Sequence, residues 1–264
     1  MIGRILNWFY PPHCIACKVM LPLNTGNFYI CERCEQLFEK VSPPFCGKCG
    51  SLLESPDEIC ASCFGKKLHF DSNEAGFLYD DLMRDLLHDM KFRRKRRIAE
   101  GLGTMWAKEI KLPHGDFVLV PLPMHRKKIK ERGFNQAEVL AQAILLKAKK
   151  CTLPSTPVAG KGQHENRRFG ETRGVEMLPL LKRVVDTPAQ SGLHPKLREE
   201  NVKDVFVVVD GYSVDGKTVV LIDDIYTTGA SANECARVLK TAGAARVYVK
   251  TLSQTLRKPG ENKI

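Results

Sequence analysis

The chain has 264 residues, 43% of them hydrophobic and 27% charged, and a formal net charge of +11. Such a composition excludes a chain that is disordered throughout. No apolar stretch reaches the roughly 18–20 residues that a transmembrane helix needs, and the first residues lack the pattern of a secretory signal. We therefore expect a cytoplasmic protein without membrane insertion, long enough for a large core and a smaller satellite domain.

Eight of the ten cysteines precede residue 64 and form four Cys-x-x-Cys pairs. This spacing lets a tight turn place two thiolates at adjacent corners of a tetrahedron, so two such turns complete a closed four-sulfur site. In a reducing compartment the pairs favour metal over disulfides and predict two structural zinc ions. The spacing allows pairing in chain order, which is the simplest, or interleaved pairing. The predicted ligands are Cys14, Cys17, Cys31, Cys34, Cys46, Cys49, Cys60 and Cys63.

The cysteine-rich part, residues 1–70, is predicted to form a double zinc-ribbon domain, followed by a larger domain over residues 71–264. The first part is nearly neutral, with 7 Lys+Arg against 6 Asp+Glu. The second part carries 34 Lys+Arg against 24 Asp+Glu. We therefore expect phosphate-rich partners to bind the larger domain.

Apolar residues at helical spacing predict two core-packed helices, one through residues 82–90 and one through residues 98–110. Between them, residues 91–97 hold six cations in seven positions. A charge run is more often a solvated surface. The functional alternative is a salt-sensitive contact with single-stranded nucleic acid, driven by counterion release. The candidate residues for that contact are Arg93, Arg94, Lys95, Arg96 and Arg97.

Further along, short apolar strands alternate with helices. The alternation predicts a parallel sheet that is covered on both faces, hence an α/β fold. Residues 155–174, rich in glycine and polar residues, are predicted to form a loop. The predicted strands are 117–122, 205–209, 218–223 and 247–252, and the predicted helices are 135–149 and 230–241.

The most informative stretch is 219–231, which reads VVLIDDIYTTGAS. An apolar strand ends in two acids, and a loop of hydroxyl residues and glycine then opens a helix. Backbone N–H groups and the helix dipole favour an anion at such a point. The carboxylates would repel a bare phosphate but can accept hydrogen bonds from a ribose diol, so the pattern predicts a phosphorylated sugar as ligand. The alternative is an acidic strand end followed by an ordinary capped turn.

This stretch resembles the phosphoribosyl pyrophosphate (PRPP) site of type I phosphoribosyltransferases. With the paired cysteines in front, the whole chain resembles the ComF (ComFC) family, whose members have an N-terminal double zinc ribbon and a phosphoribosyltransferase-like domain. Residues 121–123 and 132–136 look like the family's Pro-x-Pro and Arg-Gly-Phe-Asn-Gln signatures. A third family segment is matched by Arg183, Thr187, Gln190, Arg198 and Asn201. The stretch from Cys151 to Leu181 is longer than the family pattern leads us to expect.

The resemblance implies that Asp223 and Asp224 hold the ribose hydroxyls. The pyrophosphate, with Mg²⁺, would lie against the loop after Leu122, where Arg132 is the favoured contact for the leaving group. Residues 187–201 would form a flap over the ligand. The 5′-phosphate would be bound by Thr227, Thr228, Gly229, Ala230 and Ser231.

Two functional hypotheses follow. The first is a transferase that moves phosphoribose from PRPP to an acceptor that the residues do not name. The second is a non-catalytic PRPP sensor that binds single-stranded nucleic acid. The family resemblance implies a role in the uptake of single-stranded DNA during natural transformation, with the competence helicase machinery as a partner. Because no N-terminal catalytic cysteine is seen, a glutamine-dependent amidotransferase is not expected.

Overall fold

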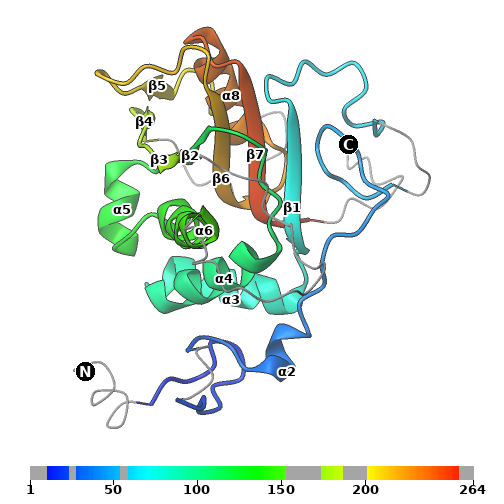
Figure 1. Ribbon diagram of the computed structural model, residues 1–264, viewed down its shortest axis with the longest axis vertical. Helices are drawn as coiled ribbons and strands as arrows, with labels where there is room; N and C mark the ends of the chain where they lie inside the picture. Colours follow the sequence, from blue (N-terminus) through cyan, green and yellow to red (C-terminus); the bar gives the residue numbers. More distant parts are fainter. Residues whose placement is uncertain (1–10, 24–27, 54–58, 153–173, 187–200, 256–264) are drawn as a thin grey trace, which may run out of the picture.

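The computed structural model describes residues 11–23, 28–53, 59–152, 174–186 and 201–255. Its centre is a five-stranded parallel sheet in the order β1-β7-β6-β2-β3 (Figure 1). A separate antiparallel pair, β4-β5, lies beside it. The strands are β1 Ser72–Leu78, β2 Phe117–Pro121, β3 Val175–Met177, β4 Leu181–Arg183, β5 Phe206–Val208, β6 Thr218–Tyr226 and β7 Arg246–Gln254.

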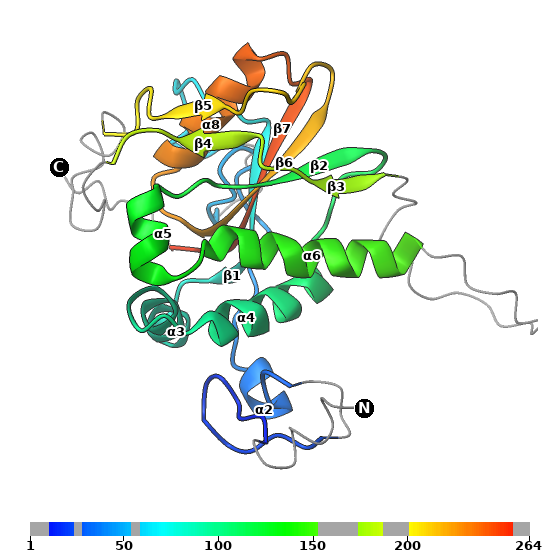
Figure 2. The same cartoon turned by 90° about the vertical axis from the view of Figure 1, so that its left-hand side faces the viewer.

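Helices cover both faces of this sheet. Helices α3, α4 and α6 lie on one side, and α8 lies on the other (Figure 2). In the part of the chain that the structure describes, no helix is both long enough and apolar enough to cross a bilayer. The helices are α2 Glu32–Glu35, α3 Asp81–Phe92, α4 Arg96–Glu109, α5 Arg126–Arg132, α6 Gln136–Thr152 and α8 Ala230–Thr241.

Successive residues of β6 belong to different apolar clusters. Val220 and Ile222 pack in the cluster that contains α3, α4 and α6. Val219 and Leu221 pack in the cluster that contains α8. Because side chains alternate along a strand and all four are fully buried, β6 lies in the middle of three layers. The predicted α/β class with a parallel sheet is confirmed.

The predicted helices of the larger part are confirmed, whereas four elements, β1, β3, β4 and α5, were not predicted. Strand β1 contains asparagine, glutamate and glycine, which have low strand propensity, and it is recognised by its alternating burial and its pairing with β7. Helix α5 is short and cationic and has no buried residue, so no apolar periodicity reveals it. The loop predicted over 155–174 and the flap predicted over 187–201 lie almost entirely outside the described residues.

The predicted end of the acidic strand was wrong by three residues. Strand β6 does not stop at Asp223 but continues to Tyr226, which is paired with Gln254 of β7. Strand β7 is also longer than predicted and supplies the extra partners. Both acids therefore lie inside a paired strand, where successive side chains point to opposite faces of the sheet.

The first cysteine-rich region, which contains Cys14 and Cys34, packs beneath α4 (Figure 1). The guanidinium of Arg97 donates hydrogen bonds to the carbonyls of His13 and Phe28 and lies 5.0 Å from the ring centre of Tyr29. An ion pair of 2.6 Å joins Lys108 of α4 to Glu35 of α2. Cysteines of this region therefore share an apolar cluster with the sheet and its helices.

The second cysteine-rich region, which contains Cys46 and Cys49, contacts the sheet at β1 and β7. The side-chain amide of Asn73 donates to the carbonyl of Cys49 at 2.8 Å, and that of Gln254 donates to the same carbonyl at 3.2 Å. Cys46 and Cys49 belong to the apolar cluster on the α8 side. The cysteine-rich part thus packs against both layers, and the boundary between residues 70 and 71 stays a prediction.

Candidate functional site

The eight predicted metal ligands gather into two groups of four. Within each group the Sγ atoms lie within 4.8 Å of one another. The Sγ atoms of Cys17 and Cys31 are 3.8 Å apart, and those of Cys49 and Cys60 are 3.6 Å apart. Tetrahedral zinc with Zn–S bonds near 2.3 Å requires sulfurs separated by about 3.8 Å. The groups therefore fit zinc, and the pairing is the one in chain order.

Hydrogen bonds make one thiol of each group easy to ionise, as metal binding requires. In the first group, burial opposes ionisation of Cys14, but backbone N–H groups lower the pKa of Cys14 to about 7. In the second group, a hydrogen bond from Cys63 lowers the pKa of Cys49 to about 4. The backbone N–H of Cys60 also donates to the Sγ of Cys46 at 3.3 Å. Four sulfurs fill each site, so both are of the closed, structural type.

The acidic doublet lies near the C-terminal end of β6. Asp224 is 4% exposed, and its Oδ2 lies 2.6 Å from the Nζ of Lys91, which belongs to the last turn of α3. Asp223 is half-buried, and its Oδ1 accepts a hydrogen bond of 2.8 Å from the backbone N–H of Asp224. Lys91 is a partner that the sequence did not predict.

The two carboxyl groups have different affinities for a proton. Burial raises the pKa of Asp223 well above its ordinary value, and the neighbouring Asp224 raises it further. Burial also opposes ionisation of Asp224, but the charge and hydrogen bond of Lys91 outweigh it and lower the pKa of Asp224, with a smaller contribution from Arg132. The negative charge of the doublet therefore resides on Asp224.

The loop after the doublet brings the predicted phosphate ligands to the same edge of the sheet. Gly229 has a φ of 76° and precedes the first turn of α8. A Cβ at this position would collide with the ring and hydroxyl of Tyr226, so only glycine fits. Asn233 donates its backbone N–H to the carbonyl of Gly229 at 2.8 Å, which fixes the start of the helix. Thr227, Thr228 and Ser231 are half-buried, and Ala230 is buried.

The two signature segments fold against the doublet. The backbone N–H of Leu122 donates to the carbonyl of Ile222, the residue before Asp223, at 2.9 Å. The side chain of Asn135 donates to the carbonyl of Leu122 at 3.0 Å and accepts from the backbone of α6. Arg132 donates to the side chain of Gln136 at 3.2 Å. The Asn-Gln pair therefore shapes the turn, and Arg132 is the signature residue whose charge reaches Asp224.

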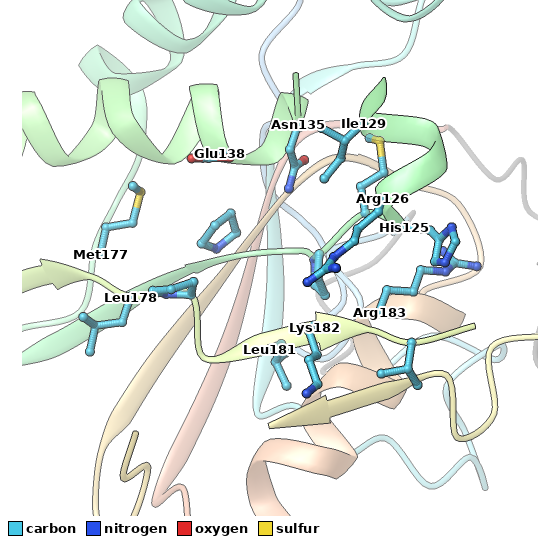
Figure 3. A pocket seen from close by; sticks show the side chains of 15 residues that line it. His125, Arg126, Ile129, Asn135, Glu138, Met177, Leu178, Leu181, Lys182 and Arg183 are labelled. Carbon is cyan, nitrogen blue, oxygen red and sulfur yellow. The ribbon is translucent and has the colours of Figure 1, made fainter. Parts of the chain in front are cut away.

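A cavity of about 620 Å³ opens between α5, the start of α6 and the β3–β4 segment (Figure 3). Figure 3 shows Asn135 and Arg126 on one wall and Leu181 and Lys182 on the opposite wall. Pro121, which pairs with Ile222 of β6, also lines the cavity, so the cavity adjoins the doublet without containing it. The other charged or titratable side chains of its lining are His125, Glu138 and Arg183.

Positive charge converges beside this cavity. Burial lowers the pKa of Arg183, and burial together with the charge of Arg183 lowers the pKa of Lys128. Asp186 lies within 3.4 Å of His125 and 3.3 Å of Lys127 and balances part of this charge. Such convergence of cations favours an anionic group of a ligand.

The basic run at 91–97 is divided by the structure. Lys91 turns inward to Asp224, so it does not belong to a solvated surface. Arg97 binds the first cysteine-rich region. Nucleic-acid binding by residues 93–97 stays a prediction, and within this run only Lys95 is half-buried while the four arginines are exposed. Ion pairs join Lys95 to Asp89 at 2.6 Å, Arg96 to Glu100 at 3.0 Å, and Arg93 to Asp89 at 3.4 Å.

Sequence comparisons find similar proteins in several bacteria. A family model described as a double zinc ribbon domain matches residues 5–64. Competence protein F of Haemophilus influenzae is 25% identical over 91% of this chain and 96% of its own length. Competence protein ComFC of Bacillus subtilis is 25% identical over 82% of this chain and 80% of its own. DNA utilization protein YhgH of Escherichia coli is 27% identical over 93% and 98%.

Solved structures with a similar arrangement include phosphoribosyltransferases. The glutamine PRPP amidotransferase of B. subtilis matches 58% of this chain with 20% identity and a TM-score of 0.34, and the chain spans 25% of that enzyme. The hypoxanthine phosphoribosyl transferase of Trypanosoma cruzi matches 69% of this chain and 72% of its own, with 15% identity and a TM-score of 0.30.

Substitution of the two acids is expected to change stability in opposite directions. Asp223→Asn removes a buried acid whose raised pKa makes it oppose folding increasingly as pH rises above its ordinary value. Asp224→Asn leaves the ammonium of Lys91 without its counter-charge, which costs about 3–5 kcal/mol. The lowered pKa of Asp224 stabilises the wild type above its ordinary pKa, and that stabilisation is lost as pH falls through the lowered value.

Urea unfolding at pH 7 measures the two changes of stability, and a series between pH 4 and pH 8 follows the pH dependence expected of Asp223. At pH 7 the Asp223→Asn protein should be more stable than the wild type, and the Asp224→Asn protein less stable. Equal losses of stability in the two variants would contradict this description of the doublet.

Removal of one cysteine is expected to empty only its own metal site. Cys34→Ser should lower the zinc content from two ions per chain to one by opening the first group, and Cys49→Ser should do the same at the second. Elemental analysis of the purified variants gives the stoichiometry. Cys235→Ala is the matched control, because Cys235 is a buried cysteine outside both groups and its variant should retain both ions.

Proposed function

Since the chain belongs to the ComF (ComFC) family of double-zinc-ribbon proteins, we propose that it binds PRPP at the C-terminal edge of its parallel sheet and acts in the handling of incoming single-stranded DNA. The observation that carries the PRPP part is the continuous unit of β6, the 227–229 loop and α8. It joins an acidic doublet, in which Asp224 is buried and Asp223 half-buried, to a glycine-dependent turn at a helix N-terminus.

Each part of PRPP has a chemical counterpart at this edge. A carboxylate of the doublet accepts hydrogen bonds from the ribose hydroxyls. The 5′-phosphate binds at residues 227–231, where the backbone N–H groups of the first turn of α8 and hydroxyl side chains converge. The pyrophosphate lies toward Arg126 and Arg132. Mg²⁺ enters as the counter-ion of the pyrophosphate, and no residue is assigned to hold it.

The adjoining cavity is the place for an acceptor. Its volume of about 620 Å³ is in the range of small-molecule sites, and its walls are partly apolar. In a transfer reaction the bond between ribose C1 and the pyrophosphate oxygen breaks, an acceptor nucleophile bonds to C1, and pyrophosphate leaves. Residues of this chain would assist by stabilising the leaving group and excluding water. The alternative is a sensor that binds PRPP at the same site without turnover.

The role in DNA handling is supported by the names of the relatives, which include competence proteins and DNA utilization proteins. Within the chain, the positive excess of residues 71–264 and the exposed arginines between α3 and α4 are suited to phosphate contacts. A cytoplasmic location and an association with competence helicase machinery belong to the same proposal.

Calorimetry with PRPP and Mg²⁺ tests the proposed site. The wild type should bind with a single site per chain, and the Asp223→Ala/Asp224→Ala protein should lose binding, because the doublet that supplies the acceptor for the ribose hydroxyls is gone. Release of pyrophosphate with any base, amine or DNA acceptor would identify a transferase. Stable binding without release would favour the sensor. A wild-type protein that binds no PRPP would refute the proposal.

Single-stranded DNA should contact the exposed end of the basic run. Replacing Arg93 and Arg94 by Gln removes cations that lie on the surface, and it should weaken binding in fluorescence anisotropy and reduce the slope of log K against log salt by about 0.7 per lost contact. Arg96→Gln is the comparison, because Arg96 lies closer to its acidic partner Glu100, at 3.0 Å, than Arg93 lies to Asp89, at 3.4 Å, and should change the slope less. An unchanged slope in the Arg93/Arg94 variant would exclude this surface.

A further inference from the structure

The register of β6 separates the two acids. Asp224 follows the alternation of Val220 and Ile222, which face α3, α4 and α6. Asp223 follows the alternation of Val219 and Leu221, which face α8. The side that carries α8 is also the side on which the phosphate loop leads into that helix. The acids are adjacent in sequence, yet their side chains leave the strand on opposite faces of the sheet.

Access to the two carboxylates also differs. The side chain of Asp224 is 6% exposed, and that of its partner Lys91 is 19% exposed. The backbone of Asp224 is held as well, because the hydroxyl of Ser253 donates to its carbonyl at 3.2 Å. A ribose diol could reach Asp224 only by displacing this packing. Asp223 is half-buried and so is less enclosed than Asp224.

A buried carboxylate needs a nearby cation, and Lys91 supplies it at 2.6 Å. With its side chain fixed to α3, Asp224 holds its own backbone N–H in place. That N–H donates to the Oδ1 of Asp223 at 2.8 Å and so orients the first carboxylate. The ion pair thereby acts on the accessible acid through one hydrogen bond.

We propose that Lys91 and Asp224 form a positioning pair and that Asp223 alone contacts the sugar, an assignment that rests on the proposed PRPP site. Lys91 comes from a helix outside the sugar-binding motif and touches no part of the ligand. It is a positioning residue, because its effect on binding passes through Asp224 to Asp223.

A double-mutant cycle tests this assignment with the PRPP–Mg²⁺ complex as the probe. The proteins are the full-length wild type, Lys91→Met, Asp224→Asn and the variant that combines both changes. Each single variant leaves one buried group without its ion-pair partner, so each should bind PRPP about tenfold more weakly. The combined variant leaves no unpaired charge, so its affinity should return to within about threefold of the wild type. Lys91→Arg keeps the charge and should also bind within about threefold.

The controls separate position from general stability. Lys250→Met breaks another ion pair of 2.6 Å, between the buried Lys250 and the half-buried Glu74 of the neighbouring strand β1, and should leave PRPP affinity unchanged. Asp223→Asn should abolish binding with or without Lys91. If a single variant does not fold, the combined variant and Lys91→Arg decide the question.

Two results would overturn the assignment while the PRPP site stands. One is a Lys91→Met protein with wild-type affinity. The other is a loss in Asp224→Asn that the second substitution does not relieve, which would show that Asp224 itself binds the sugar. A wild type that binds no PRPP would instead refute the proposed function, and this assignment with it.

Discussion

Strand β6 is buried on both faces, so it can carry charged side chains only near an end where other elements can neutralise them. The residues from Val219 to Ile222 are fully buried, and the doublet follows directly. Polar chemistry is therefore confined to the C-terminal edge of the sheet. The turn around Gly229, the segment after β2 and the last turn of α3 all converge on that edge.

The metal sites belong to this arrangement through packing. Three cysteines of the first group, Cys14, Cys31 and Cys34, pack in the apolar cluster of α3, α4 and β6, and the four of the second group pack in the cluster of α8. A closed zinc site fixes a short segment that has too few apolar residues to fold alone. Each ribbon then presents a rigid surface to one layer of the sheet. Charge contributes to this packing as well. Arg97, a cation of the basic run, donates hydrogen bonds to backbone carbonyls of the first cysteine-rich region.

Local patterns were sufficient to predict the elements with strong periodicity and the two groups of four cysteines. They failed where tertiary contacts decide. Lys91 was assigned to a cationic run, although it lies four residues after the buried Leu87 and so shares its helix face. No local rule indicates that a lysine on that face meets Asp224, which is 133 residues away. The extension of β6 to Tyr226 likewise depends on pairing with β7, and α5 has no apolar face to detect.

The sequence motif presents two equivalent acids, and the fold makes them unequal. A pair of adjacent carboxylates in a low-dielectric site cannot both be ionised without a counter-charge. Lys91 of α3 stabilises the ionised form of Asp224. Among the described residues Asp223 has no such ion-pair partner, so it keeps a higher affinity for a proton and can accept hydrogen bonds from a ligand. A ligand that arrives with hydroxyl groups can satisfy that second carboxylate without disturbing the buried ion pair. The asymmetry follows from strand register and a single lysine, and it requires no change in the motif itself.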